Sequence, residues 1–116
     1  MSAPLDLQIA RRARALITKP ENWCRLWFGE DAKGVLNIGD LEFADKLCAH
    51  GALMRAASET IPDPHKADDM ALGIVCKMLR VDDPLNAQSL LWRFNRMRDH
   101  AAVLRLFDRF IQGVRS

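Results

Sequence analysis

The sequence lacks the features that mark membrane proteins, secreted proteins and strongly charged nucleic-acid-binding proteins. No apolar run approaches the roughly 20 residues that a membrane-spanning helix needs. The N-terminal segment places Asp6, Arg11, Arg12 and Arg14 among its apolar residues, so we expect no secretory signal. The formal net charge of +2 is too small to indicate a polyanionic partner by itself.

Cysteine is scarce, and the spacings typical of metal and phosphate sites are missing. The three cysteines, Cys24, Cys48 and Cys76, are odd in number and far apart in the sequence. We therefore expect free thiols in a reducing cytosol and a cytoplasmic location. Because no C-x-x-C or H-E-x-x-H spacing and no glycine-rich phosphate loop is present, we expect no metal and no cofactor.

What the chain does contain fits one soluble globular domain spanning residues 1–116. Of its residues, 49% are hydrophobic and 28% are charged, which is ordinary for such a domain. We expect a mainly α-helical (α+β) fold, a compact bundle of about five helices with one short β-hairpin near residues 25–38. Two short runs that flank a glycine-bearing loop predict the hairpin, which must pack against the helices to be stable.

Capping residues predict where several helices begin. Asp63-Pro64 combines a good N-cap with proline at the first helical position, and Asp99 is placed to cap the last helix. Asp40 is expected to cap a long central helix. A tight break over residues 95–98 is expected to separate a helix at about 86–94 from the last one.

The stretch Leu47-Cys48-Ala49-His50-Gly51-Ala52-Leu53 places a thiol, an imidazole and a glycine in the expected central helix. Glycine costs about 1 kcal/mol relative to alanine in a helix interior, so a closely packed neighbour is a good reason for it. Ala44, Gly51 and Ser58 are spaced seven apart and predict a row of small residues that another backbone approaches. Gly51 is therefore assigned a structural role.

Cys48, His100 and Asn95 provide the residue types of a cysteine hydrolase. In such a set the imidazole lowers the pKa of the thiol, and the amide orients the imidazole ring. The alternative is that Cys48 belongs to the packed core, because cysteine is among the most often buried residues. Both interpretations are open at this point, and so is the question of whether the protein is an enzyme.

Positive charge gathers near the C-terminus, where six arginines follow Trp92 and only two aspartates accompany them. Arg93, Arg96 and Arg98 are expected at the N-terminal end of the last helix, with Trp92 available for stacking on a base. Cations there oppose the helix dipole, which favours a bound anion. The alternatives are contact with nucleic acid or an acidic partner and a solvated arginine surface.

Trp23 and Trp27 lie beside the expected hairpin and allow two interpretations. In the first, they form a recognition surface, since tryptophan is enriched in binding hot spots. In the second, they cover the edge of the core where the hairpin docks. We expect a macromolecular interaction module whose partner is a protein, which can be a second copy of the chain. No membrane contact is expected.

Three segments share an order and spacing with a known family. They are Trp23 with the turn Asp31-Ala32-Lys33-Gly34, then Cys48-Ala49-His50-Gly51-Ala52, then Asn95 followed by His100-Ala101-Ala102-Val103. Together they resemble a family of small bacterial and phage-associated proteins classed as a domain of unknown function. The resemblance covers about residues 15–111 and implies a bacterial or phage setting, but it implies no activity.

The chain departs from the pattern of that family in two places. Arg96 stands where the family has the acidic member of an Asn-Asp pair. The connector from Asn95 to His100 is also shorter than in the family. Asp99 replaces the threonine of the family, but both residues serve as N-caps, so the helix start is preserved.

Overall fold

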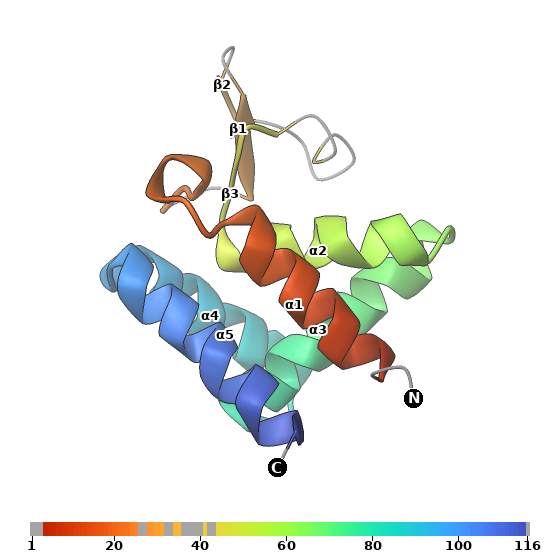
Figure 1. The fold of residues 1–116 in the computed structure, drawn as a ribbon. Coiled ribbons are helices and arrows are strands. Elements are labelled where there is room, and N and C mark those ends of the chain that lie inside the picture. Colours follow the sequence, from red (N-terminus) through yellow and green to blue (C-terminus); the bar gives the residue numbers. More distant parts are fainter. Residues whose placement is uncertain (1–3, 26–27, 32–33, 36–40, 42–43, 116) are drawn as a thin grey trace.

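The computed structural model describes residues 4–25, 28–31, 34–35, 41 and 44–115. In these ranges the chain forms five α-helices, a short 3₁₀ turn and three short strands (Figure 1). In chain order the elements are α1 (Leu5–Leu16), η1 (Pro20–Asn22), β1 (Gly29–Asp31), β2 (Gly34–Val35), β3 (Lys46–Leu47), α2 (Ala49–Thr60), α3 (Pro64–Leu79), α4 (Pro84–Met97) and α5 (His100–Arg115). The expected mainly helical fold with five helices is confirmed.

Two of the predicted helix starts are formed by side-chain caps. The Asp63 carboxylate accepts hydrogen bonds from the backbone N–H groups of His65 and Lys66, at 2.9 and 3.4 Å. The Asp99 carboxylate accepts from the Ala102 N–H at 2.8 Å. These bonds satisfy backbone donors that have no partner within the first helical turn. The starts of α3 and α5 are therefore determined by local sequence.

One buried apolar cluster has members in all five helices. Each helix contributes at least one side chain that is 0–1% exposed, namely Ile9, Leu53, Ile74, Leu91 and Phe107. α2 packs against both α1 and α3, α3 packs against α4, and α4 and α5 lie side by side (Figure 1). Burying a side chain of this size stabilises the folded state by about 1.5–3 kcal/mol. In the described ranges, no helix combines the length and the apolar character needed to cross a bilayer.

The strands form a small sheet next to the N-terminal end of α2, in the order β2-β1-β3 (Figure 1). β1 and β2 make the antiparallel hairpin that was expected within residues 25–38, with Glu30 opposite Val35. β1 also pairs with β3, where Gly29 lies opposite Leu47, and a parallel bridge joins Leu47 to Trp23. The third strand was not predicted.

The prediction that one central helix begins at Asp40 is wrong. Asp40 itself lies outside the described residues, but residues 46–47 form β3, and α2 begins only at Ala49. Leu47 is 2% exposed, and its carbonyl oxygen accepts from the Cys24 N–H at 3.1 Å. Pairing with β1 and with the segment around Cys24 holds this stretch extended, so partners distant in sequence override its helical periodicity.

The predicted row of small residues is also wrong, because Ala44 lies before the helix and Ser58 is exposed. Gly51 does contact a neighbouring backbone. A Cβ atom at Gly51 would overlap the carbonyl oxygen of Phe28 and lie 2.9 Å from its carbonyl carbon. The close approach is therefore to the chain entering β1 and not to another helix.

The predicted break over residues 95–98 is wrong as well. α4 extends from Pro84 to Met97, and the chain turns at Arg98 and Asp99. Asparagine often weakens a helix by bonding to nearby backbone. Asn95 is instead 3% exposed inside α4, and its amide is engaged by groups from distant parts of the chain.

Candidate functional site

The side-chain amide of Asn95 joins three parts of the chain that are far apart in the sequence. Its Oδ1 accepts hydrogen bonds from the Trp23 indole Nε1 at 2.8 Å and from the Ala49 backbone N–H at 3.1 Å. Its Nδ2 donates to the carbonyl oxygens of Cys24 at 3.1 Å and Arg25 at 2.7 Å. These four bonds use both hydrogens and both lone pairs of the amide. Asn95 therefore fixes α4 to the start of α2 and to the segment before the hairpin.

Arg25 closes the C-terminal end of α4. Its Nη1 donates to the carbonyl oxygens of Arg96 and Arg98, each at 2.8 Å. The last carbonyls of a helix have no partner inside the helix, so a guanidinium group at this place satisfies them and complements the helix dipole. The guanidinium carbon also lies 5.2 Å from the centroid of the Trp23 ring, within the range of a cation–π contact.

His100 is half-buried, and its ring also contacts Trp23. The two ring centroids are 5.5 Å apart, and His100 Nε2 lies 2.6 Å from the carbonyl oxygen of Ile17. A carbonyl oxygen can only accept, so His100 carries its proton on Nε2 in this contact. The imidazole thus connects the first turn of α5 to the end of α1.

Cys48 is the N-cap of α2, and its Sγ accepts a hydrogen bond from the Gly51 N–H at 3.3 Å. Its own backbone N–H donates to the Phe28 carbonyl oxygen at 3.2 Å. The side chain is buried, and this burial raises the pKa of the Cys48 thiol to about 11. At neutral pH the sulfur is therefore a protonated thiol, which is a poor nucleophile.

Cys48, Asn95 and His100 lie around one junction, where Trp23 and the start of α2 meet α4, but they do not form a catalytic triad. Asn95 bonds to the residue after Cys48, and Trp23 contacts both Asn95 and His100. Each of the three side chains is nevertheless bonded to a different group, and no hydrogen bond among the described residues joins Cys48 to His100. This geometry favours structural roles for all three.

His50 is the polar residue of this region whose role the sequence did not indicate. It is 4% exposed, its Nδ1 accepts a hydrogen bond from the Trp92 indole at 3.2 Å, and its ring contacts Phe28. Burial lowers the pKa of His50 to about 4. The neutral imidazole therefore holds the Trp92 side chain against α2, a contact that no local sequence pattern could reveal.

Acidification should destabilise the folded protein because of His50. The folded-state pKa of about 4 lies below the ordinary value of 6.5, so on acidification the unfolded chain takes up the proton first. This contribution is complete well above pH 6.5 and should shrink by about 2 kcal/mol between pH 8 and pH 5. Urea unfolding at several pH values measures this change in the free energy of unfolding. The His50→Gln variant should lose this pH dependence, and the exposed His65→Gln variant should keep it; an unchanged slope in His50→Gln would contradict the assignment.

The outward surface of α4 is apolar to an unusual degree. Among the described residues, all four large hydrophobic side chains classed as exposed lie on α4: Leu85 is 72% exposed, Met97 69%, Trp92 44% and Leu90 37%. Single exposed apolar residues are common on soluble proteins, whereas several on one element are not. We call this surface the α4 face; it consists of Leu85, Ser89, Leu90, Trp92, Arg93, Arg96 and Met97.

The α4 face is also positively charged. Arg93 and Arg96 are exposed, and residues 84–98 contain three arginines and no aspartate or glutamate. Arg98 follows at the C-cap of α4, where its guanidinium carbon lies 5.3 Å from the centroid of the Phe94 ring. The surface therefore combines apolar side chains with the positive charge of Arg93 and Arg96.

The chain matches a family of unknown function, DUF6197, over residues 1–112. The chain belongs to this family. No curated protein and no solved structure matches it. Membership agrees with the resemblance found in the sequence and supplies no activity.

The predicted binding residues of this family member have different surroundings. Trp23 is half-buried and bonded to Asn95, so it takes part in internal packing. Trp27 lies outside the described residues. Arg93 and Arg96 are in the last turns of α4, where cations complement the helix dipole, so the expectation that they oppose the dipole of the last helix is wrong.

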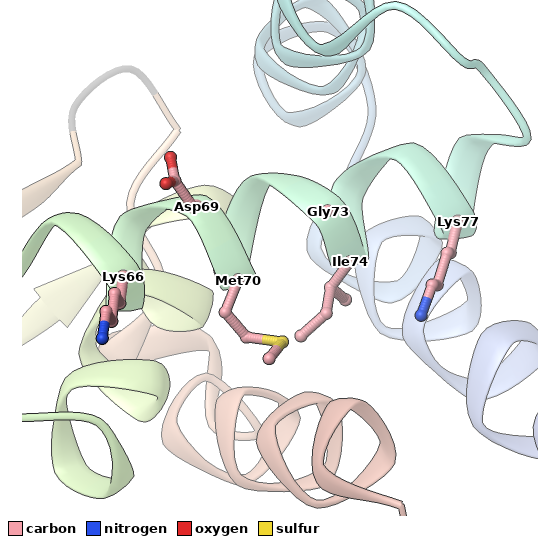
Figure 2. Close-up of a pocket in the computed structure, with 6 residues that line it drawn as sticks. All are labelled: Lys66, Asp69, Met70, Gly73, Ile74 and Lys77. Atoms are coloured by element: carbon pink, nitrogen blue, oxygen red, sulfur yellow. The ribbon is translucent and has the colours of Figure 1, made fainter.

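A hollow of about 340 Å³ lies along α3 (Figure 2). Figure 2 shows the side chains of Met70 and Ile74 beside each other with Lys66 and Lys77 at the two ends, while Asp69 points away. Lys77 Nζ donates to the Asp6 carboxylate at 2.8 Å. In the ranges that the structure describes, no three His, Cys, Asp or Glu side chains gather as a metal site would require.

Proposed function

We propose that the protein is a macromolecular interaction module that docks through the α4 face. Its partner is a protein surface that presents carboxylates beside apolar side chains. The observation that carries this proposal is the concentration of exposed large hydrophobic residues on α4 alone among the described residues. Tryptophan and arginine are the residue types most enriched in binding hot spots, and this face holds both.

The spacing of the face suits a groove or helix on the partner. Leu85, Ser89, Trp92 and Arg96 follow one another at intervals of four, three and four residues, which places them on one line along the helix. Leu90, Arg93 and Met97 form a second line beside it. Such a pattern fits the packing of one helix against an elongated apolar surface.

The charge of the face argues for an acidic partner and against a second copy of the chain. The guanidinium groups of Arg93 and Arg96 make no hydrogen bond or ion pair with any residue that the structure describes, so both are available to carboxylates. A two-fold symmetric dimer formed through this face would bring the same arginines of two copies together. Like charges across an interface cost several kcal/mol, so a different, acidic protein is the better partner.

Two further points support an interaction role in the cytoplasm. The pKa of the buried Cys48 thiol is raised, which disfavours a thiol enzyme. Cys24, Cys48 and Cys76 are all free thiols, which suits a reducing compartment. A bacterial or phage setting is part of the same proposal.

The proposal can be tested by charge reversal on α4. The tagged full chain is used to recover partners from the cells that produce it, in parallel with the Arg93→Glu/Arg96→Glu variant. A matched control, Arg11→Glu/Arg105→Glu, reverses two exposed arginines on α1 and α5. All four side chains are exposed, so unfolding free energies should stay within about 0.5 kcal/mol of the parent.

The α4 variant should recover its partner at least tenfold less efficiently than the parent and the control. A partner that all three chains recover equally would contradict the proposal. Loss of recovery after nuclease treatment would assign the arginines to nucleic acid instead, and direct binding of DNA or RNA should then weaken steeply with salt.

A further inference from the structure

A second surface, separate from the α4 face, lies where α3, α4 and α5 meet. A groove of about 630 Å³ is lined by the C-terminal part of α3, by Phe94 on the inner side of α4, and by the second half of α5. Grooves of about 300–1,000 Å³ are the size that small organic ligands occupy. The volume of this groove therefore suits a small molecule.

The charged residues on this groove are all cationic. Lys77, Arg80 and Arg109 line it, and no carboxylate does. Lys77 is bonded to Asp6, whereas the guanidinium groups of Arg80 and Arg109 make no hydrogen bond or ion pair with residues of the described ranges. A guanidinium group pairs with an oxyanion through two parallel hydrogen bonds, so two of them form a strong site for carboxylate, phosphate or sulfonate.

Arg80 is held in a backbone conformation that arginine rarely adopts. Its φ of 58° and ψ of 46° place it in the left-handed region, and it is the one non-glycine residue of the described chain with positive φ. Glycine is the usual residue at this position after a helix, and other residues there cost of the order of 1 kcal/mol. The side chain of Arg80 is thus present at the groove in spite of a local conformational cost.

The remaining wall is apolar and offers two aromatic rings. Phe94 and Phe110 line the groove and are half-buried, and the more deeply buried side chains of Leu106 and Met78 line it as well. Gly113 leaves room at the α5 side, because a Cβ atom there would meet no atom within 4 Å. Phenyl rings favour offset or edge contacts with another aromatic ring.

We propose that this groove binds a small organic anion that carries an aromatic ring. The oxyanion pairs with Arg80 and Arg109, and the ring packs against Phe94 and Phe110. The site is independent of the proposed function, because none of these residues belongs to the α4 face.

The test uses two probes that differ by one sulfonate group. Anilinonaphthalene sulfonate has an aromatic body and one sulfonate, and phenylnaphthylamine has the same aromatic body without the sulfonate. Fluorescence titration of the full chain should show one sulfonate probe bound per chain. The neutral probe should bind at least tenfold more weakly, since it cannot pair with the arginines.

Three variants locate the site. Arg80→Gln/Arg109→Gln should weaken binding of the sulfonate probe at least tenfold and leave the neutral probe unaffected. Gly113→Phe should block both probes while preserving the fold, because its side chain enters open space. The control Arg11→Gln/Arg105→Gln should bind like the parent. Thermal unfolding of each variant shows that it is folded.

Several results would overturn the proposal. They are the absence of saturable binding of the sulfonate probe, equal affinity for the two probes, and unchanged affinity in the Arg80→Gln/Arg109→Gln or Gly113→Phe variant. Loss of binding in Leu85→Gln/Met97→Gln with retention in Gly113→Phe would place the probe on the α4 face and overturn it too.

Discussion

Replacing Asn95 with leucine is expected to lower the free energy of unfolding by about 4 kcal/mol. Leucine has the same number of side-chain heavy atoms in the same branched arrangement, but its methyl groups are bulkier and form no hydrogen bonds. Lost hydrogen bonds and overpacking therefore both contribute to the loss. The change leaves the Trp23 indole N–H, the Ala49 N–H and the Cys24 and Arg25 carbonyls without their bonds to Asn95. An unsatisfied buried polar group costs about 1–3 kcal/mol, and relaxation of the segment recovers part of the sum.

A matched control is available on the same helix. Asn86 is exposed near the start of α4, so Asn86→Leu should change the unfolding free energy by no more than about 0.5 kcal/mol. Urea unfolding followed by circular dichroism measures both variants. If Asn95→Leu lost less than about 1 kcal/mol, the four bonds would not hold α4 in place as described.

Gly51→Ala is expected to lower the free energy of unfolding by about 3 kcal/mol. A Cβ at this position overlaps the Phe28 carbonyl oxygen, which also accepts the hydrogen bond from the Cys48 N–H. The carbonyl cannot move away without weakening that bond, which joins the chain entering β1 to the cap of α2. The clash involves backbone, so a change of side-chain rotamer does not relieve it.

Gly73 provides the comparison that isolates this contact. It also lies in the middle of a helix, but a Cβ there would meet no atom within 4 Å. Gly73→Ala should therefore raise the unfolding free energy by up to about 1 kcal/mol, the ordinary helix preference for alanine. Thermal or urea unfolding of the two variants should give changes of opposite sign. Changes of the same sign and size would contradict the close approach at Gly51.

The parts of the fold that the sequence predicted correctly depend on neighbouring residues. Asp63-Pro64 and Asp99 cap α3 and α5 through bonds that span two or three residues. The β1–β2 hairpin likewise follows from turn residues between two short runs. Such interactions leave a signal in the local sequence, because all their partners lie within a few positions.

The parts that were predicted wrongly depend on partners far away in the chain. Residues 46–47 have helical periodicity but are held extended by β1 and by the segment around Cys24. Asn95 is accommodated in the last turn of α4 because its amide bonds to groups 46 and 70 residues earlier in the chain. No spacing rule within a short window could indicate these contacts.

The sequence identified the residues of the candidate site but not how they are arranged in space. The sequence drew attention to Cys48, Asn95 and His100, and the structure places them around one junction with other bonding partners. The arginines of α4 were also noticed. The exposure of Leu85 and Met97 was not, since a sequence does not show which apolar residues of a helix remain uncovered.

The internal contacts of α4 hold the helix that carries the α4 face. Asn95 and Arg25 hold one side of α4 firmly, and the opposite side is the α4 face. A surface on a rigid element loses little conformational entropy when it binds, which favours affinity. The residues of the junction are therefore expected to matter for partner binding only through the position of α4.

Site-specific photo-crosslinking tests most directly whether α4 is the contact surface. A photoreactive phenylalanine derivative is introduced at Ser89, in the centre of the α4 face, and in a control chain at Asp68, which is exposed on α3. After irradiation in the producing cells, the chain labelled at position 89 should become linked to an acidic protein, and the control should not. A partner linked through position 68 and not through position 89 would contradict the central claim.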